Sequence, residues 1–217
     1  MHVFLSFSAL LFDMDGTLVD STVVVERTWR RFARRHGIDA SEVLADAHGR
    51  PTGETVLRFA PDGVDVARET ATLVAEEVED IEGVVQVPGA AEFLRRVPES
   101  RMAVVTSASR ELAVRRMEAA GVPLPSVLVT ADDISSGKPD PEGYLKAAEL
   151  LGVPPSSTVV FEDAESGLLA AEAAGATPVV VGSHDRASAA GRIGIRDFHA
   201  ISVAGFDEDE RVGISFE

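Results

Sequence analysis

The sequence predicts a doubly wound α/β fold, in which a Rossmann-like parallel sheet is covered by helices and carries an inserted α-helical cap. Three observations lead to this expectation. Short, β-branched apolar runs recur along the chain. Segments with helical spacing of apolar residues alternate with those runs, as in doubly wound sheets. One long stretch, from residue 19 to residue 85, has helical spacing throughout and no convincing buried strand.

The apolar runs are too short for helices and nearly continuous in hydrophobicity, which is typical of parallel strands buried on both faces. We expect strands at Ala9–Asp13, Met102–Ser107, Val127–Ala131, Thr158–Asp163 and Thr177–Gly182, and a weaker one in the run FHAISV at 198–203. The apolar residues before the first strand lack a basic flank and a small-residue cleavage site, and are too few to span a bilayer. We therefore expect them to form a loosely held leader.

Helices are expected between these strands. One begins at Pro88, and the others end at Gly121, Gly152 and Gly175, where glycine can adopt the left-handed conformation of a C-cap. The helical stretch after the first strand would lie over that strand's carboxyl end, with hinges near 18–20 and 85–88. We therefore predict an α/β core over residues 1–18 and 86–204 and a helical cap over 19–85. The ending, residues 205–217, reads as an acidic, solvated tail.

Composition narrows the classes of site and partner. The 217 residues include no cysteine, so disulfides and thiolate metal sites are excluded, and the cytoplasm is the expected location. A formal net charge of −16 disfavours nucleic acids and anionic membrane surfaces as partners. An anionic substrate would therefore require a local positive centre, which a bound metal ion can supply.

Polar side chains follow several of the predicted strands. Ligands of doubly wound sheets bind beyond the carboxyl ends of the strands, so these side chains are the candidate site. They are Asp13 and Asp15 after the first strand, Thr106 and Ser107 after the second, Lys138 beyond the third, and Glu162 and Asp163 after the fourth.

Together these groups suit phosphoryl transfer. Asp13, Asp163 and a backbone carbonyl offer the oxygen ligands that Mg²⁺ prefers. The Asp13 carboxylate can attack phosphorus and form an aspartyl-phosphate, while Asp15 can protonate the leaving group and later activate water. Lys138 and the Thr106 hydroxyl, with the amides after it, can hold the remaining phosphate oxygens.

The segments DMDGT, GKPDP and FEDAESG, with a Thr-Ser at the second strand end, resemble in order and spacing the motifs of the haloacid dehalogenase superfamily. The resemblance extends to about Val203. It implies that Asp13 is the nucleophile, that Asp15 is the acid/base and that Mg²⁺ is the cofactor. It also implies that Asp13, the Asp15 main-chain oxygen and Asp163 bind the metal, with Glu162 as a further ligand or a neighbour of the ligands. The second acid argues against the dehalogenase branch.

Further segments, AHGRPT, RFAPD, VPGA and VLVTADDISSGKPDPEGYLKAAE, are similar to the phosphatases of small sugar and polyol phosphates. This resemblance implies a small phosphorylated metabolite as the partner, with His48 and Arg50 as contacts from the cap. That group often has His-Gly-x-Arg-Thr, whereas here Arg50 comes one place early and Pro51 takes its position. The exact substrate therefore stays open, and we expect a monomer or a weak dimer.

Two alternatives remain. A β-phosphoglucomutase-like enzyme shares the motif order, but such mutases carry a histidine twelve residues beyond the nucleophile, where this chain has Val25. A binding or regulatory module without turnover would retain the same residues. Whether Glu26, early in the first cap helix, faces the site is not decided by the sequence.

Overall fold

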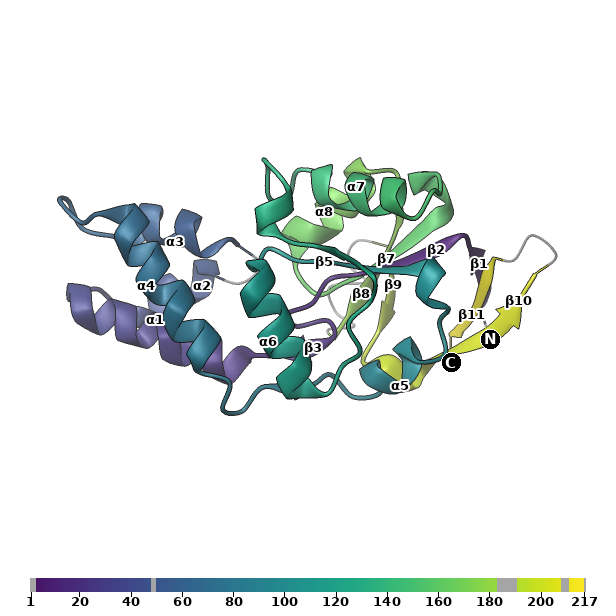
Figure 1. Cartoon of the computed structure of the whole chain (residues 1–217), viewed down its shortest axis with the longest axis horizontal. Coiled ribbons are helices and arrows are strands. Elements are labelled where there is room, and N and C mark those ends of the chain that lie inside the picture. Colours follow the sequence, from purple (N-terminus) through teal and green to yellow (C-terminus); the bar gives the residue numbers. More distant parts are fainter. Residues whose placement is uncertain (1–2, 48–49, 183–190, 208–210, 217) are drawn as a thin grey trace.

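The computed structural model describes residues 3–47, 50–182, 191–207 and 211–216. A central parallel sheet separates a helical cap at one end of the molecule from a small antiparallel sheet at the other (Figure 1). No helix in these ranges is long and apolar enough to cross a membrane.

The six-stranded sheet has the order β6-β5-β2-β7-β8-β9, and all its neighbours are parallel. The first strand of this sheet along the chain, β2, thus lies in the middle, where the chain reverses its direction of winding, as in Rossmann-like sheets. The predicted α/β fold is confirmed. The strands are β2 (Ala9–Phe12), β5 (Met102–Val105), β6 (Val127–Val129), β7 (Thr158–Glu162), β8 (Thr177–Val181) and β9 (Ile193–Ile195).

Helices cover both faces of this sheet (Figure 1). Leu10 and Phe12 of β2 belong to the apolar cluster shared with α5 (Ala90–Leu94) and α6 (Arg110–Ala120). Leu11 points to the other face and joins α7 (Glu142–Leu150) and α8 (Glu165–Ala173). Both faces of β2 are therefore apolar, because a central parallel strand contacts helices on each side. Short 3₁₀ helices precede or follow strands at Glu99–Arg101, Ala131–Asp133, Pro155–Ser157 and Phe198–Ala200.

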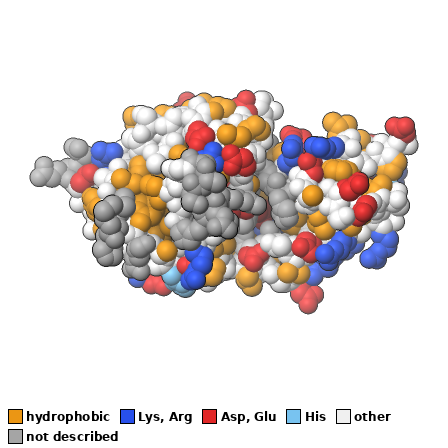
Figure 2. All heavy atoms as spheres, turned by 180° about the vertical axis from the view of Figure 1, so that it is seen from behind, with side chains coloured by type: hydrophobic (Ala, Val, Ile, Leu, Met, Phe, Trp, Pro, Cys, Tyr) orange, Lys and Arg blue, Asp and Glu red, His pale blue; other side chains and the backbone are white. Residues whose placement is uncertain are grey.

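The cap consists of α1 (Thr22–His36), α2 (Ala40–Ala47), α3 (Thr52–Phe59) and α4 (Val66–Glu79). These helices pack around an apolar cluster of their own that includes Trp29, Phe32 and Leu73. A short antiparallel pair, β3 (Val19–Asp20) and β4 (Val85–Gln86), joins the cap to the core. Seen from behind, Lys and Arg side chains gather along the edge of the cap (Figure 2).

The two ends of the chain differ from the prediction. Residues Val3–Phe7 form β1 and Val212–Phe216 form β11, which lies between β1 and β10 (Ile201–Phe206) in an antiparallel sheet. Val212, Ile214 and Phe216 are buried against the core. The expected loose leader and the expected solvated tail over 205–217 are therefore wrong for the described residues. Apolar residues at every second position form a buried strand face, and this pattern outweighs the acidic residues before it.

The run FHAISV is also not a strand of the parallel sheet. Its first half is a 3₁₀ helix and its second half begins β10 of the antiparallel sheet. The sixth parallel strand is instead β9, which pairs with β8. Its three residues read Ile-Gly-Ile, a run too short to stand out in the sequence.

Candidate active site

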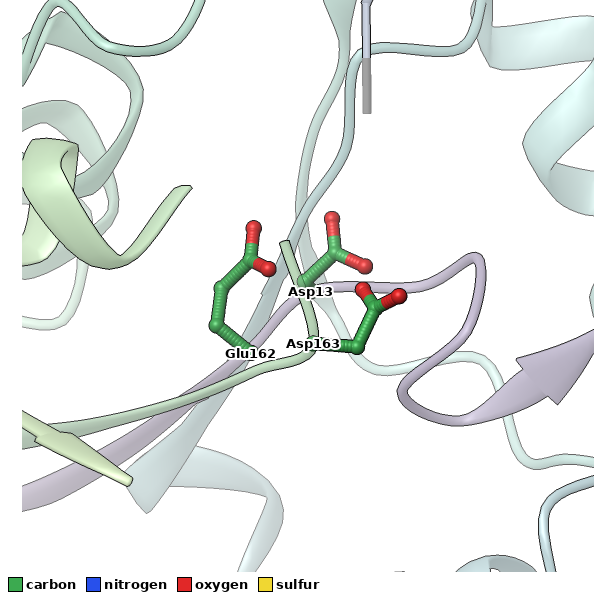
Figure 3. Close-up of side chains that lie close together, drawn as sticks. All are labelled: Asp13, Glu162 and Asp163. Atoms are coloured by element: carbon green, nitrogen blue, oxygen red, sulfur yellow. The ribbon is translucent and has the colours of Figure 1, made fainter. Parts of the chain in front are cut away.

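Asp13 directly follows β2, the central strand of the sheet. Its backbone N–H donates to the carbonyl of Phe161 in β7 at 2.9 Å, which continues the strand pairing up to the carboxylate. Glu162 ends β7 and Asp163 follows it, so the carboxylates of these two residues and of Asp13 lie close together at the ends of adjacent strands (Figure 3). One oxygen from each carboxylate lies within 4.8 Å of the others.

Lys138, in the loop before α7, reaches this carboxylate cluster with its side chain. Its Nζ donates to Asp13 Oδ1 at 2.5 Å, to Glu162 Oε1 at 2.8 Å and to the Val105 carbonyl at 3.2 Å. The side chain is buried and lies over the ring of Tyr144. The pKa of Lys138 lies well above its usual value, because the carboxylates of Asp13 and Glu162 outweigh the effect of burial. Lys138 is therefore a fixed cation rather than a solvated surface lysine.

Glu162 holds this lysine in place. Its Oε1 accepts from Lys138 and, at 3.4 Å, from the Tyr144 hydroxyl, and its Oε2 accepts from the backbone N–H of Ala164 at 2.7 Å. The first turn of α8 packs directly against the carboxylate, since a Cβ atom on Gly167 would lie 1.6 Å from Oε1. Both oxygens thus have partners, and these contacts fit a group that orients Lys138.

Asp163 packs against the turn that follows β2. Gly16 has a φ of 85°, and a Cβ atom there would lie 2.2 Å from Asp163 Oδ2, so both the turn and the packing require glycine. Burial raises the pKa of Asp163 to about 7, and the neighbouring Glu162 carboxylate adds to the shift. The pKa of Asp13 is raised as well, chiefly by burial, although Lys138 opposes the shift.

The oxygen atoms of this cluster fit a metal ion. The carboxylates of Asp13 and Glu162 are buried and that of Asp163 is half-buried, and one oxygen from each lies within 4.8 Å of the others. Closely spaced carboxylate oxygens are the ligands of hard divalent cations. The residues present therefore fit a divalent cation held by Asp13 and Asp163.

Asp15 lies on the cap side of this cluster. Its Oδ1 accepts from the Ser21 hydroxyl at 2.5 Å and from Arg116 Nη1 at 2.9 Å. Arg116, in α6, also donates through Nη2 to Glu77 Oε1 in α4 at 3.2 Å. Arg116 and Glu77 were not found by sequence reasoning, because charged residues in amphipathic helices are expected to face solvent.

A pocket of about 120 Å³ opens beside these groups, between the core and the cap. The structure brings the predicted residues Asp13, Asp15, Thr106, Ser107, Glu162, Asp163 and Arg50 to its wall, and Lys138 contacts Asp13 directly behind it. Thr106 Oγ1 accepts from the Ala108 N–H at 3.1 Å. Cap residues at the pocket include Val25 and Trp29, whereas Glu26 pairs with Arg30 and does not line it. His48 lies outside the described residues.

Comparison with known proteins agrees with this geometry. The family model of haloacid dehalogenase-like hydrolases matches residues 7–175. Hexitol phosphatase A of Escherichia coli (strain K12) is 42% identical over 175 residues, covering 79% of this chain and 81% of the relative. Validoxylamine A 7'-phosphate phosphatase of Streptomyces hygroscopicus subsp. limoneus is also 42% identical, over 178 residues, with coverages of 78% and 83%.

Among solved structures, a hydrolase from Pseudomonas syringae superposes with a TM-score of 0.75 at 25% identity, covering 87% of this chain and 92% of that one. The β-phosphoglucomutase of Clostridium difficile, at 20% identity and a TM-score of 0.76, shows the same fold. The expected resemblance to phosphatases of sugar and polyol phosphates is confirmed, as is the prediction of a phosphoric monoester hydrolase. The chain belongs to the haloacid dehalogenase-like hydrolases.

Proposed function

We propose that this enzyme is a Mg²⁺-dependent phosphatase of small sugar or polyol phosphomonoesters and acts through an aspartyl-phosphate on Asp13. The observation that carries the proposal is the position of the Asp13 carboxylate. It lies on the pocket wall, paired with the buried Lys138 and close to a half-buried acid, Asp163. Asp15 lines the same pocket, two residues further along the chain.

In the first step an Asp13 carboxylate oxygen attacks phosphorus, and the bond from phosphorus to the ester oxygen breaks. Asp15 donates a proton to the departing alcohol, and the resulting carboxylate then takes a proton from the water that hydrolyses the aspartyl-phosphate. Lys138 keeps a positive charge beside the transferring group throughout.

Other groups hold the phosphate. Because Thr106 Oγ1 accepts from the Ala108 N–H, its own hydroxyl proton can be donated to a phosphate oxygen. A Mg²⁺ ion bound by Asp13, Asp163 and the Asp15 main-chain oxygen would neutralise charge on the phosphoryl group. Glu162 fixes Lys138, in keeping with its bonds to the lysine and to the Ala164 N–H.

The substrate class follows from the relatives and from the pocket. One relative is named as a hexitol phosphatase and another as a phosphatase of validoxylamine A 7'-phosphate. The pocket combines the polar side chains of Ser21, Thr52 and Arg50 with the Trp29 ring. This mixture suits a small leaving group with several hydroxyls. We assign residues 19–85 to a cap that closes over it, while a cytoplasmic location and a monomer or weak dimer remain predictions.

A mutase is the second candidate for the same site. Val25 lines the pocket from α1, at the position where the similar mutases carry histidine. An isopropyl side chain neither donates nor accepts a proton, so it cannot assist transfer to a sugar hydroxyl. Water is therefore the favoured acceptor. Incubation with β-glucose 1-phosphate distinguishes the two, since a mutase yields glucose 6-phosphate and a phosphatase yields free phosphate.

The test is release of inorganic phosphate from a panel of sugar, hexitol and glycerol phosphates, with Mg²⁺ and with EDTA. We expect turnover only with the metal, and loss of turnover in Asp13→Asn. Asp13→Asn with full activity on the best substrate would refute the mechanism. Binding of Mg²⁺ and a phosphate analogue without hydrolysis of any ester would instead identify a binding module.

A further inference from the structure

Arg116 is a buried arginine at the junction of the core and the cap. It lies in α6 of the core, with its side chain only 5% exposed, and it lines the pocket. Arginine is rarely buried in this way unless its charge is paired on more than one side. The groups that Arg116 binds therefore indicate its role.

Those partners belong to different parts of the molecule. Nη1 donates at 2.9 Å to Oδ1 of Asp15, on the loop after the nucleophile strand. Nη2 donates at 3.2 Å to Oε1 of Glu77 in the cap helix α4. The Glu77 side chain is also only 5% exposed. The guanidinium group is planar and rigid, so its two nitrogens set the distance between the groups that they bind. A shift of α4 relative to α6 would therefore strain or break one of these bonds.

The remaining contacts of Asp15 and Glu77 reinforce this bridge. The Ser21 hydroxyl, directly after β3 of the hinge, donates to the same Asp15 oxygen at 2.5 Å. Thr52, at the start of α3, approaches Glu77 Oε2 at 3.5 Å. Asp15 is thus held by a hinge residue and by an arginine that is itself tied to the cap.

We propose that Arg116 is a positioning residue that couples cap closure to the acid/base, holding Asp15 through Nη1 while Nη2 binds Glu77 of the cap. The inference rests on the proposed function, because it takes Asp15 as the group that protonates the leaving alcohol. Arg116 acts through Asp15: within the described residues its side-chain hydrogen bonds go to Asp15 and Glu77, and not to the carboxylates of Asp13 and Asp163. When the cap moves away, Arg116 loses Glu77, and its guanidinium group is no longer held in the orientation that binds Asp15.

The leaving group of the substrate provides the test. An alkyl ester departs as a poor leaving group and needs the proton of Asp15, whereas p-nitrophenolate departs as a stable anion and does not. We expect Arg116→Ala to lower kcat/KM for glycerol phosphate about 10- to 100-fold, and for p-nitrophenyl phosphate less than about threefold. Arg115→Ala, an exposed arginine one position earlier in the same helix, is the matched control and should leave both values unchanged.

Asp15→Asn supplies the reference for this pattern. It should show the same selective loss to a greater extent, and adding Arg116→Ala to it should cause no further loss, because both changes remove one function. An equal loss on both esters in Arg116→Ala would reduce Arg116 to a structural role and overturn the proposal. So would an additive loss in the double variant.

The cap arm of the bridge is tested through Glu77→Gln, which keeps the shape of the side chain but removes its charge. Trp29 is the only tryptophan of the chain and lines the pocket from the cap, so its fluorescence reports the position of the cap. We expect Glu77→Gln to increase acrylamide quenching of Trp29 and to produce the same ester-selective loss, smaller than in Arg116→Ala. Unchanged quenching together with an unchanged ratio between the esters would overturn the coupling.

If Arg116→Ala does not fold, Arg116→Lys and Glu77→Gln carry the test. A lysine keeps the charge but cannot bind two carboxylates through two nitrogens. Arg116→Lys should therefore lower kcat/KM for glycerol phosphate selectively, but less than Arg116→Ala does. Failure of the proposed function would look different, since Asp13→Asn would then stay active or no ester would be hydrolysed by the unaltered enzyme.

Discussion

Gly167, in the first turn of α8, lies directly against the Glu162 carboxylate, which holds the buried Lys138. A Cβ atom there would lie 1.6 Å from Glu162 Oε1 and 2.1 Å from its carboxyl carbon, far inside van der Waals contact. Gly167 is helical, so alanine introduces no backbone strain and the collision is the only perturbation. We predict that Gly167→Ala displaces Glu162 and weakens its hydrogen bond to Lys138.

The size of the effect follows from the bond that is lost. Glu162 accepts from Lys138 at 2.8 Å, and a hydrogen bond to a charged group contributes about 1.5–3 kcal/mol. If Lys138 loses that much of its stabilising contact in the transition state, kcat/KM falls about 10- to 150-fold. Overpacking costs about 1–3 kcal/mol, and the better helix propensity of alanine offsets about 1 kcal/mol of it. The net loss of stability is therefore at most about 2 kcal/mol.

The assay compares kcat/KM and thermal unfolding of Gly167→Ala with those of a second glycine variant. Gly53→Ala, in cap helix α3, is the control because its new Cβ would approach no heavy atom outside its own helix and chain neighbours closer than 3.5 Å. We expect the control to be slightly more stable and fully active. The reasoning would be refuted if Gly167→Ala retained the kcat/KM and the melting temperature of the unaltered enzyme.

The remaining predictions concern the metal and the antiparallel sheet. Burial raises the pKa of Asp163 from 3.8 to about 7, so this group destabilises the metal-free fold as pH rises between those values. Below pH 7 a proton competes with Mg²⁺, and calorimetry should show an affinity that strengthens about tenfold per pH unit up to neutrality; a flat profile would contradict this. Gly16→Ala should weaken Mg²⁺ binding, because the new Cβ would displace Asp163, and an unchanged dissociation constant would count against it. Ile214→Ala should lower the free energy of unfolding by about 2–5 kcal/mol in chemical denaturation and leave kcat intact. An unchanged unfolding midpoint would mean that β11 does not support the core.

The sequence made the acid cluster predictable, because Asp13 and Asp163 follow long apolar runs. Carboxyl ends of parallel strands meet at one edge of a sheet, so their side chains meet as well. Lys138 was predictable for a different reason: the spacing of its motif, rather than a strand, placed it at the site. Asp13, Asp163 and Lys138 could therefore each be recognised from the short segment of sequence around them.

Arg116 and Glu77 could not be predicted in the same way. Each is one of many charged residues in its helix, and only the tertiary contact between α4 and α6 buries them against each other. The strand β11 was missed although its alternation of apolar residues was visible, because the acidic residues before it suggested a solvated segment. The apolar alternation predicted a strand and the acidic residues predicted a solvated tail. The strand formed because β1 and β10 are available to pair with it.

Strand β11 joins the beginning and the end of the sequence, since Val3 is paired with Phe216. Pairing over such a separation closes a loop of more than 200 residues, and long-range strand pairing of this kind is slow because of the entropy of loop closure. During synthesis, β1 therefore has no β11 to pair with until residues 212–216 have been added. Until then its backbone N–H and C=O groups on that edge stay unpaired, and such an edge can associate with strands of other chains.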